Sequence, residues 1–92
     1  MTIEEIAAVE TVAALTQLAK DRGISFSIQT AETMKAQRLP EFDEAKLLGA
    51  IGRVWVTFWV REESDTVHVS FFFDAGQHVI GRQLKIETNN LP

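Results

Sequence analysis

The sequence contains no cysteine and no long apolar run. Without cysteine there are no disulfides, thiolate metal sites or cysteine nucleophiles, and a reducing compartment fits this composition. The longest nearly apolar stretch, residues 47–60, includes Arg53 and Thr57 and is too short to cross a bilayer. Acidic Glu4 and Glu5 stand where a signal peptide would carry basic residues. We therefore expect a cytoplasmic protein that does not contact membranes.

Basic residues are also few. Nine Lys and Arg are scattered among thirteen Asp and Glu, which gives a formal net charge of −4. Affinity for nucleic acid comes from clustered Lys and Arg, so we expect no nucleic-acid partner. One form of protein binding fits this charge: an acidic surface that mimics nucleic acid and thereby blocks a protein that binds nucleic acid. The composition, 46% hydrophobic and 24% charged, is typical of a globular protein.

The first half of the chain predicts helix, strand, loop and short helix. Thr2 and Glu5 have capping-box spacing, and residues 3–22 lack proline and glycine, so one long helix is expected there. Residues 24–30 alternate between apolar and polar, as in a half-buried strand whose isoleucines and phenylalanine face inward. The polar stretch 31–42 predicts a long loop, followed by a short helix over 44–48.

The second half predicts a meander of three strands, at 54–60, 66–74 and 79–87, with turns at 62–65 and 75–78. We expect Val60 to pair with Val69 and Phe73 with Ile80, because these registers bring apolar residues together on one face. The predicted fold is therefore α+β, an N-terminal helix packed on a four-stranded antiparallel sheet (α-β-(short α)-β-β-β). We expect one domain over residues 1–92, with 88–92 as a frayed tail.

The strand at 54–60 is apolar on both faces. Val54, Val56, Phe58 and Val60 alternate with Trp55, Thr57 and Trp59. The face that carries both tryptophans is expected to gather these further residues from the next strand: His68, Ser70 and Phe72.

An aromatic cluster of Trp55, Trp59 and Phe72 predicts a protein-binding surface, because aromatic side chains bury a large area with few rotatable bonds. The protein would then be a small acidic, non-catalytic interaction module. It would act either as a homodimer or as an inhibitor or immunity-type binder of another protein. In the alternative interpretation, residues 31–48 fold over this face and make a small second core.

A small-molecule or enzymatic site is the alternative function. Asp74 and His78 flank a turn, and an aspartate that orients a histidine is a common acid–base arrangement. Neither Ser64 nor Ser70 is clearly placed as a nucleophile beside them, and polar residues are ordinary at turns. A metal site would need three or four converging ligands. We therefore expect no catalysis, no metal and no cofactor.

Arg82 conflicts with the pattern, because it shares the inward face with Ile80 and Leu84. An edge strand, or a bulge near Gly81, would let its side chain reach solvent. The alternative is a buried ion pair with Glu10.

Overall fold

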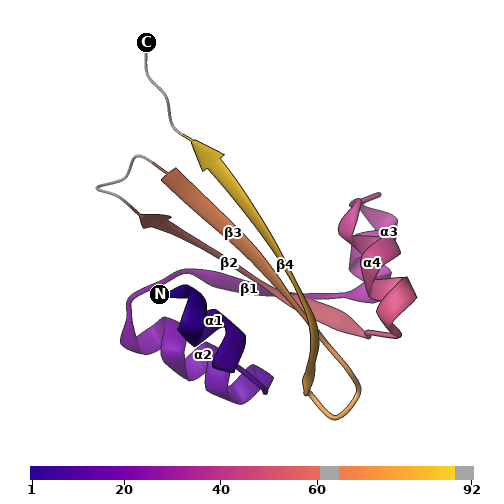
Figure 1. Ribbon diagram of the computed structural model, residues 1–92. Helices are drawn as coiled ribbons and strands as arrows, with labels where there is room; N and C mark the ends of the chain where they lie inside the picture. Colours follow the sequence, from indigo (N-terminus) through magenta and orange to yellow (C-terminus); the bar gives the residue numbers. More distant parts are fainter. Residues whose placement is uncertain (61–64, 89–92) are drawn as a thin grey trace.

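The computed structural model describes residues 1–60 and 65–88, and it has the predicted α+β class (Figure 1). The elements along the chain are α1 (Ile3–Ala8), α2 (Val12–Asp21), β1 (Phe26–Thr30), α3 (Ala31–Ala36), α4 (Glu41–Leu48), β2 (Gly52–Val60), β3 (Asp65–Phe73) and β4 (Val79–Thr88). The strands form one antiparallel sheet in the order β1-β2-β3-β4. The α1–α2 pair packs on one face of this sheet, and α3–α4 lies on the other face at one end (Figure 1).

Two of the predicted segments fall partly outside the described residues. The predicted turn at 62–65 lies outside them except for Asp65, which begins β3. The expected tail at 88–92 lies outside them except for Thr88, which ends β4. In the part of the chain that is described, no helix combines the length and the apolar character that a transmembrane span requires.

The predicted single helix over residues 3–22 is wrong, because the chain leaves the helical conformation at Val9 and folds back as a helical hairpin. Thr11 starts α2, and its side-chain oxygen accepts a hydrogen bond from the backbone N–H of Ala14. The linker also pairs with the β3–β4 hairpin: Val79 N–H donates to the carbonyl of Glu10 at 2.8 Å. These tertiary backbone bonds compensate for the intrahelical bonds lost at the break.

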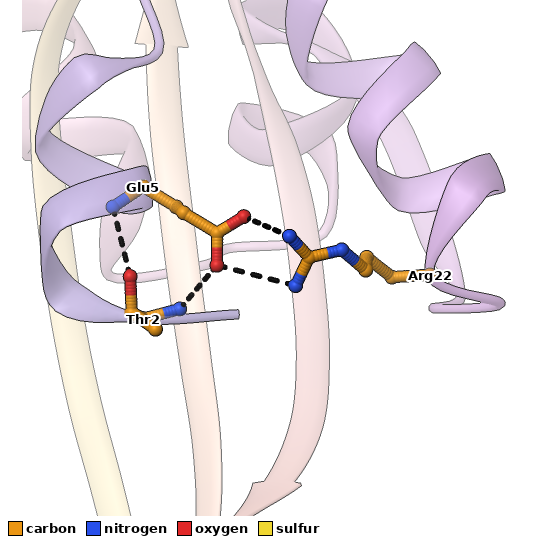
Figure 2. A network of polar contacts seen from close by, with 3 residues as sticks. All are labelled: Thr2, Glu5 and Arg22. Carbon is orange, nitrogen blue, oxygen red and sulfur yellow. Dashed lines mark hydrogen bonds and ion pairs between the residues drawn. The ribbon is translucent and has the colours of Figure 1, made fainter.

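The start of α1 is held to the end of α2 by a polar network (Figure 2). Thr2 and Glu5 form the predicted capping box, with both reciprocal hydrogen bonds present. Both guanidinium NH2 groups of Arg22 donate to the Glu5 carboxylate. The pKa of Glu5 lies below its ordinary value, first because its carboxylate accepts the backbone N–H of Thr2 and also because Arg22 lies beside it. The capping box therefore serves tertiary structure as well as the helix itself.

The hairpin brings the apolar residues of both helices to one core. Ile6 and Val9 would lie on a different side from Leu15 in one straight helix, but the turn at the linker places all three in the same cluster. Opposite them lie the inward-facing side chains of the sheet, which are Val54, Val56, Val67, Val69, Phe71 and Phe73. Ile28, expected to face inward, is 54% exposed, so the helices do not reach the far end of β1.

The Arg82 side chain contacts the end of α1, which explains how a charged residue can lie on the inward face of the sheet. Its Nε donates to the carbonyl of Ile6 at 2.9 Å, and a terminal NH2 group donates to the carbonyl of Val9. The last carbonyls of a helix lack intrahelical partners and carry partial negative charge, so a guanidinium suits them. The predicted edge position and bulge are both present, since β4 is an edge strand and its register shifts beside Phe73. A pair with Glu10 is not among the contacts within the described residues.

Replacing Arg82 with methionine should destabilise the protein by about 1–2 kcal/mol, because two partly buried carbonyls lose charge-assisted hydrogen bonds. Urea denaturation followed by circular dichroism measures this loss. Arg82→Lys is the matched control, because lysine keeps the charge but lacks the forked donors of the guanidinium. Its stability should lie between that of wild type and that of Arg82→Met. A loss below about 0.5 kcal/mol for Arg82→Met would mean that the guanidinium merely reaches solvent.

The register between β2 and β3 differs from the prediction by four residues. Val56, not Val60, lies opposite Val69, and Val60 lies opposite Asp65. Pairing therefore extends to Val60 and Asp65, the described residues nearest to the hairpin connection. The predicted β3–β4 register holds for most of its length, with Val69 opposite Leu84, but a bulge places Val79 rather than Ile80 opposite Phe73.

The predicted loop over 31–42 is wrong, because most of this stretch is helical. Thr30 ends β1 and caps α3 through a hydrogen bond from the N–H of Thr33 to its side-chain oxygen. Helix α4 begins at Glu41, three residues before the predicted start, and ends at Leu48 as predicted, with Gly49 as its C-cap at a φ of 70°. Arg38 takes a φ of 56° at the turn between α3 and α4.

Candidate functional site

The tryptophan-bearing face of the sheet is divided into a covered end and an open end. At the covered end α3 and α4 pack on Phe72, which has no exposed surface. The buried members of this second core are Met34, Ala45, Ala50 and Phe72. The alternative interpretation, that residues 31–48 cover this face, is therefore confirmed here. Phe72, expected to bind a partner, is a core residue because the α3–α4 hairpin shields it.

Helices α3 and α4 leave Trp55 and Trp59 exposed. Trp55 is 39% exposed and Trp59 is 63% exposed. Strand β1 is short and pairs with β2 only as far as Val56, so Trp59 also lacks a neighbouring strand on that side within the described residues. Thr57 lies between them on β2, opposite His68 of β3. We call the surface formed by Trp55, Thr57, Trp59 and His68 the open aromatic face.

An open groove of about 680 Å³ runs between this face and the turn that joins α3 to α4. The sheet provides its floor, through the residues Gln29, Arg53, Trp55, His68, Ser70, Gln83, Leu84, Lys85 and Glu87. The wall is made of Gln37, Leu39, Pro40 and Glu41. A second groove, of about 560 Å³, lies beside Trp59 and reaches the start of α1 and the end of α2. The two tryptophans thus border two separate hollows.

Arg53 anchors the floor of the first groove, and the sequence did not single it out. It is only 5% exposed. Its Nε donates to Gln29 Oε1 and its Nη1 to Ser70 Oγ, both at 2.7 Å, while Glu41 lies 3.7 Å away. Burial lowers the pKa of Arg53 from its ordinary value, and the nearby Glu41 carboxylate opposes this shift. Its guanidinium also lies 5.7 Å from the centre of the Trp55 ring, within cation–π range.

These contacts give Ser70 a structural role. The sequence places it on the binding surface, whereas in the structure it is 5% exposed and accepts the Arg53 hydrogen bond. Strand alternation alone would have placed Arg53, Trp55 and Ser70 on the same face. It could not have revealed that β1 supplies Gln29 and α4 supplies Glu41 as further partners of the arginine. The result is a rigid base under Trp55.

His68 stacks on Trp55, with ring centroids 5.9 Å apart and planes inclined by 13°. Its Nδ1 lies 3.1 Å from Thr57 Oγ1. Its Nε2 is buried and makes no hydrogen bond within the described residues, although Glu87 Oε2 lies 3.4 Å away. The open aromatic face therefore has a stacked, pre-ordered centre at Trp55 and His68 and a freely exposed indole at Trp59.

Asp74 and His78 lie at the β3–β4 turn, and neither lines either of the two grooves. The backbone N–H of His78 donates to Asp74 Oδ1 at 2.9 Å, and that oxygen lies 3.5 Å from His78 Nδ1. The pKa of Asp74 is below its ordinary value, mainly because of the backbone hydrogen bond from His78. The Asp74 carboxylate thus makes the contacts of a side chain that closes a turn. Among the described residues, no three His, Asp or Glu side chains gather in a way that would hold a metal ion.

The chain was compared with protein families, with curated proteins and with solved structures, and none of them matches it.

Proposed function

We propose that the protein is a non-catalytic interaction module that binds another protein through the open aromatic face. The observation that carries this proposal is the exposure of Trp59 and Trp55 on a sheet whose other end is covered. Large aromatic side chains contribute most to binding energy where they enter a partner's pocket and are surrounded by residues that exclude water. Trp59 can insert in this way, with Thr57 and Phe58 beside it along the second groove.

The charges around the face support a protein rather than a nucleic-acid partner. Glu41 and Glu87 border the first groove, and the chain has a formal net charge of −4. A phosphate backbone would meet these carboxylates. Of the lysine and arginine residues that line the groove in the described part of the chain, Arg53 is buried and bound to Gln29 and Ser70, so Lys85 is the exposed one. An inhibitor or immunity-type role, in which the acidic module covers the basic surface of a partner, is consistent with this balance. The cytoplasmic location stays a prediction.

The prediction for this surface is a selective loss of binding on truncation of a tryptophan. Trp59→Ala and Trp55→Ala should each weaken partner binding by about thirtyfold or more, the effect of losing a hot-spot residue worth about 2 kcal/mol. Leu47 on α4 is the matched control, because it is 82% exposed but lies outside the face. Affinity capture from extracts of the native host, with wild type, both tryptophan variants and Leu47→Ala, makes the comparison.

Two outcomes of this capture experiment are informative. A protein retained by wild type and Leu47→Ala, and lost with both tryptophan variants, supports the proposal. Retention that is unaffected by either tryptophan substitution contradicts it. Circular dichroism on each variant shows whether the fold is intact, and we expect Trp59→Ala to cost less than about 1 kcal/mol of stability, because this side chain is mostly exposed.

A further inference from the structure

The outer edge of β4 is closed at its start and open along its end. At the start, the linker between α1 and α2 pairs with the strand: Thr11 bridges to His78, and Val79 N–H donates to the carbonyl of Glu10. Beyond Val79, none of the backbone hydrogen bonds outside the sheet reaches β4 within the described residues. An unpaired strand edge is a template for another strand. The free edge therefore runs from residue 80 to residue 88.

The side chains along the free edge combine exposed apolar and charged groups. On the helix side of the sheet, Leu84 is 44% exposed and Ile86 is 57% exposed. On the other side lie Lys85 and Glu87, both exposed. Natural proteins commonly protect edges with proline, bulges, lysines or inward-pointing charges. Residues 80–88 contain no proline, Arg82 is engaged by α1 and the bulge lies at the closed start of the strand, so Lys85 and Glu87 are the charged residues along the free edge.

A second copy of this strand can pair with it in only a few registers. When two identical strands pair antiparallel in one sheet, a twofold axis perpendicular to the sheet relates them, and one residue faces its own copy. Registers centred on Arg82, Lys85 or Glu87 place like charges opposite each other. A centre at Gln83 carries the second strand past Val79, where the linker already occupies the edge. A centre at Leu84 stays within residues 80–88, but it reaches the bulge between Val79 and Gly81 and places no opposite charges against each other.

The register centred on Ile86 avoids both problems. It places Ile86 opposite Ile86 of the second copy and Leu84 opposite Thr88. By symmetry it also places Lys85 opposite Glu87 twice, so two pairs of opposite charges face each other directly. Among the registers that the free edge can accommodate, the facing charges therefore favour this one.

We propose that two copies of the protein form a twofold dimer through antiparallel pairing of their β4 edges, centred on Ile86. The two sheets then continue as one. Because the axis is perpendicular to the sheet, the α1–α2 hairpins of the two copies lie on one side of the joined sheet. The open aromatic faces of the two copies lie on the other side. The dimer does not depend on the function proposed for the aromatic face, but it would present that face twice.

A charge-exchange experiment tests the dimer. Sedimentation equilibrium should show a dimer for wild type. Association should be at least tenfold weaker for Lys85→Glu and for Glu87→Lys, because each substitution places like charges opposite each other at both 85–87 contacts. An equimolar mixture of the two variants should associate again. In the mixed dimer, one copy carries acidic side chains at positions 85 and 87 and the other carries basic side chains at both. Each of the two 85–87 contacts then joins an acidic side chain to a basic one. Lys46→Glu on α4 is the matched control for charge reversal and should behave as wild type.

Three results would overturn the proposal. A wild type that stays monomeric up to millimolar concentration excludes the dimer. Association that is weakened by the single variants but not recovered in the mixture excludes this register. A dimer that is insensitive to both charge reversals and lost with Trp59→Ala would place self-association on the open aromatic face instead. Neither of the first two results affects the aromatic-face proposal, which is tested by capture of a different protein.

Discussion

Replacing Phe72 with alanine should destabilise the protein by about 3–5 kcal/mol, the usual cost of truncating a fully buried phenylalanine. The side chain forms the centre of the second core, in contact with residues of α3 and α4. Small domains have a total stability of about 5–15 kcal/mol, so the variant should unfold at a much lower urea concentration. Urea denaturation followed by tryptophan fluorescence gives the difference directly.

Trp59→Ala is the matched control for Phe72→Ala, since both remove an aromatic side chain from the same face of the sheet. Limited proteolysis adds a local readout: residues 31–48 should become sensitive in Phe72→Ala and stay protected in Trp59→Ala, because Phe72, unlike Trp59, packs against α3 and α4. A Phe72→Ala variant with unchanged stability but lost partner binding would return Phe72 to the binding surface that the sequence predicts.

Gly52→Ala should also be strongly destabilising, by about 1–3 kcal/mol or more, because the added methyl group has no room. A Cβ atom at this position would lie 2.6 Å from the backbone oxygen of Gln29 and 2.7 Å from Cζ of Phe73. The first neighbour belongs to the paired strand β1 and the second to the first core, so neither can move without disturbing the sheet. Thermal and urea denaturation measure the cost.

Gly81→Ala is the informative comparison, because its clash is just as close but its neighbour can move. The new Cβ would lie 2.5 Å from Cδ1 of Leu48, at the far end of a flexible side chain on α4. We expect a loss below about 1 kcal/mol, since Leu48 can change rotamer. Equal effects of the two substitutions would show that close contact with backbone is not what makes Gly52 necessary.

Both proposals for function concern the part of the sheet that the helices leave uncovered. Helices α1 and α2 cover one face, and α3 and α4 cover one end of the other (Figure 1). Trp59 and Ile86, both more than half exposed, lie on opposite faces beyond this cover. We assign Trp59 to the binding of a partner protein and Ile86 to pairing with a second copy of this chain. The capture and sedimentation experiments can therefore succeed or fail separately.

The face of each strand residue could be predicted from the sequence, and the reason is the period of two. The predicted β2–β3 pairing is wrong by four residues, yet an even shift leaves every side chain on its predicted face. Val56 and Phe71 point into the first core as expected, and Trp55 and Trp59 point to the other side. The capping box at Thr2 and the end of α4 at Gly49 were also predictable, because both are local motifs.

The candidate site was predictable only as a face. Trp55, Thr57, Trp59 and His68 do lie together on its open end, whereas Phe72 is covered. Whether a residue is exposed depends on elements distant in sequence, and residues 31–42 show no helical pattern that would reveal their cover. Arg53 was missed for the same reason, because its partners come from β1, β3 and α4.

The sequence by itself thus determined the class of fold, the two faces of each strand and the local helix caps, because these depend on neighbouring residues and on backbone geometry. Only the tertiary structure decided where the first helix breaks, which end of the tryptophan face is covered and which part of β4 stays open. At the break, backbone bonds to the β3–β4 hairpin and the Arg82 guanidinium outweigh the helix propensity of residues 3–22. Contacts of that kind are long-range, and no local pattern records them.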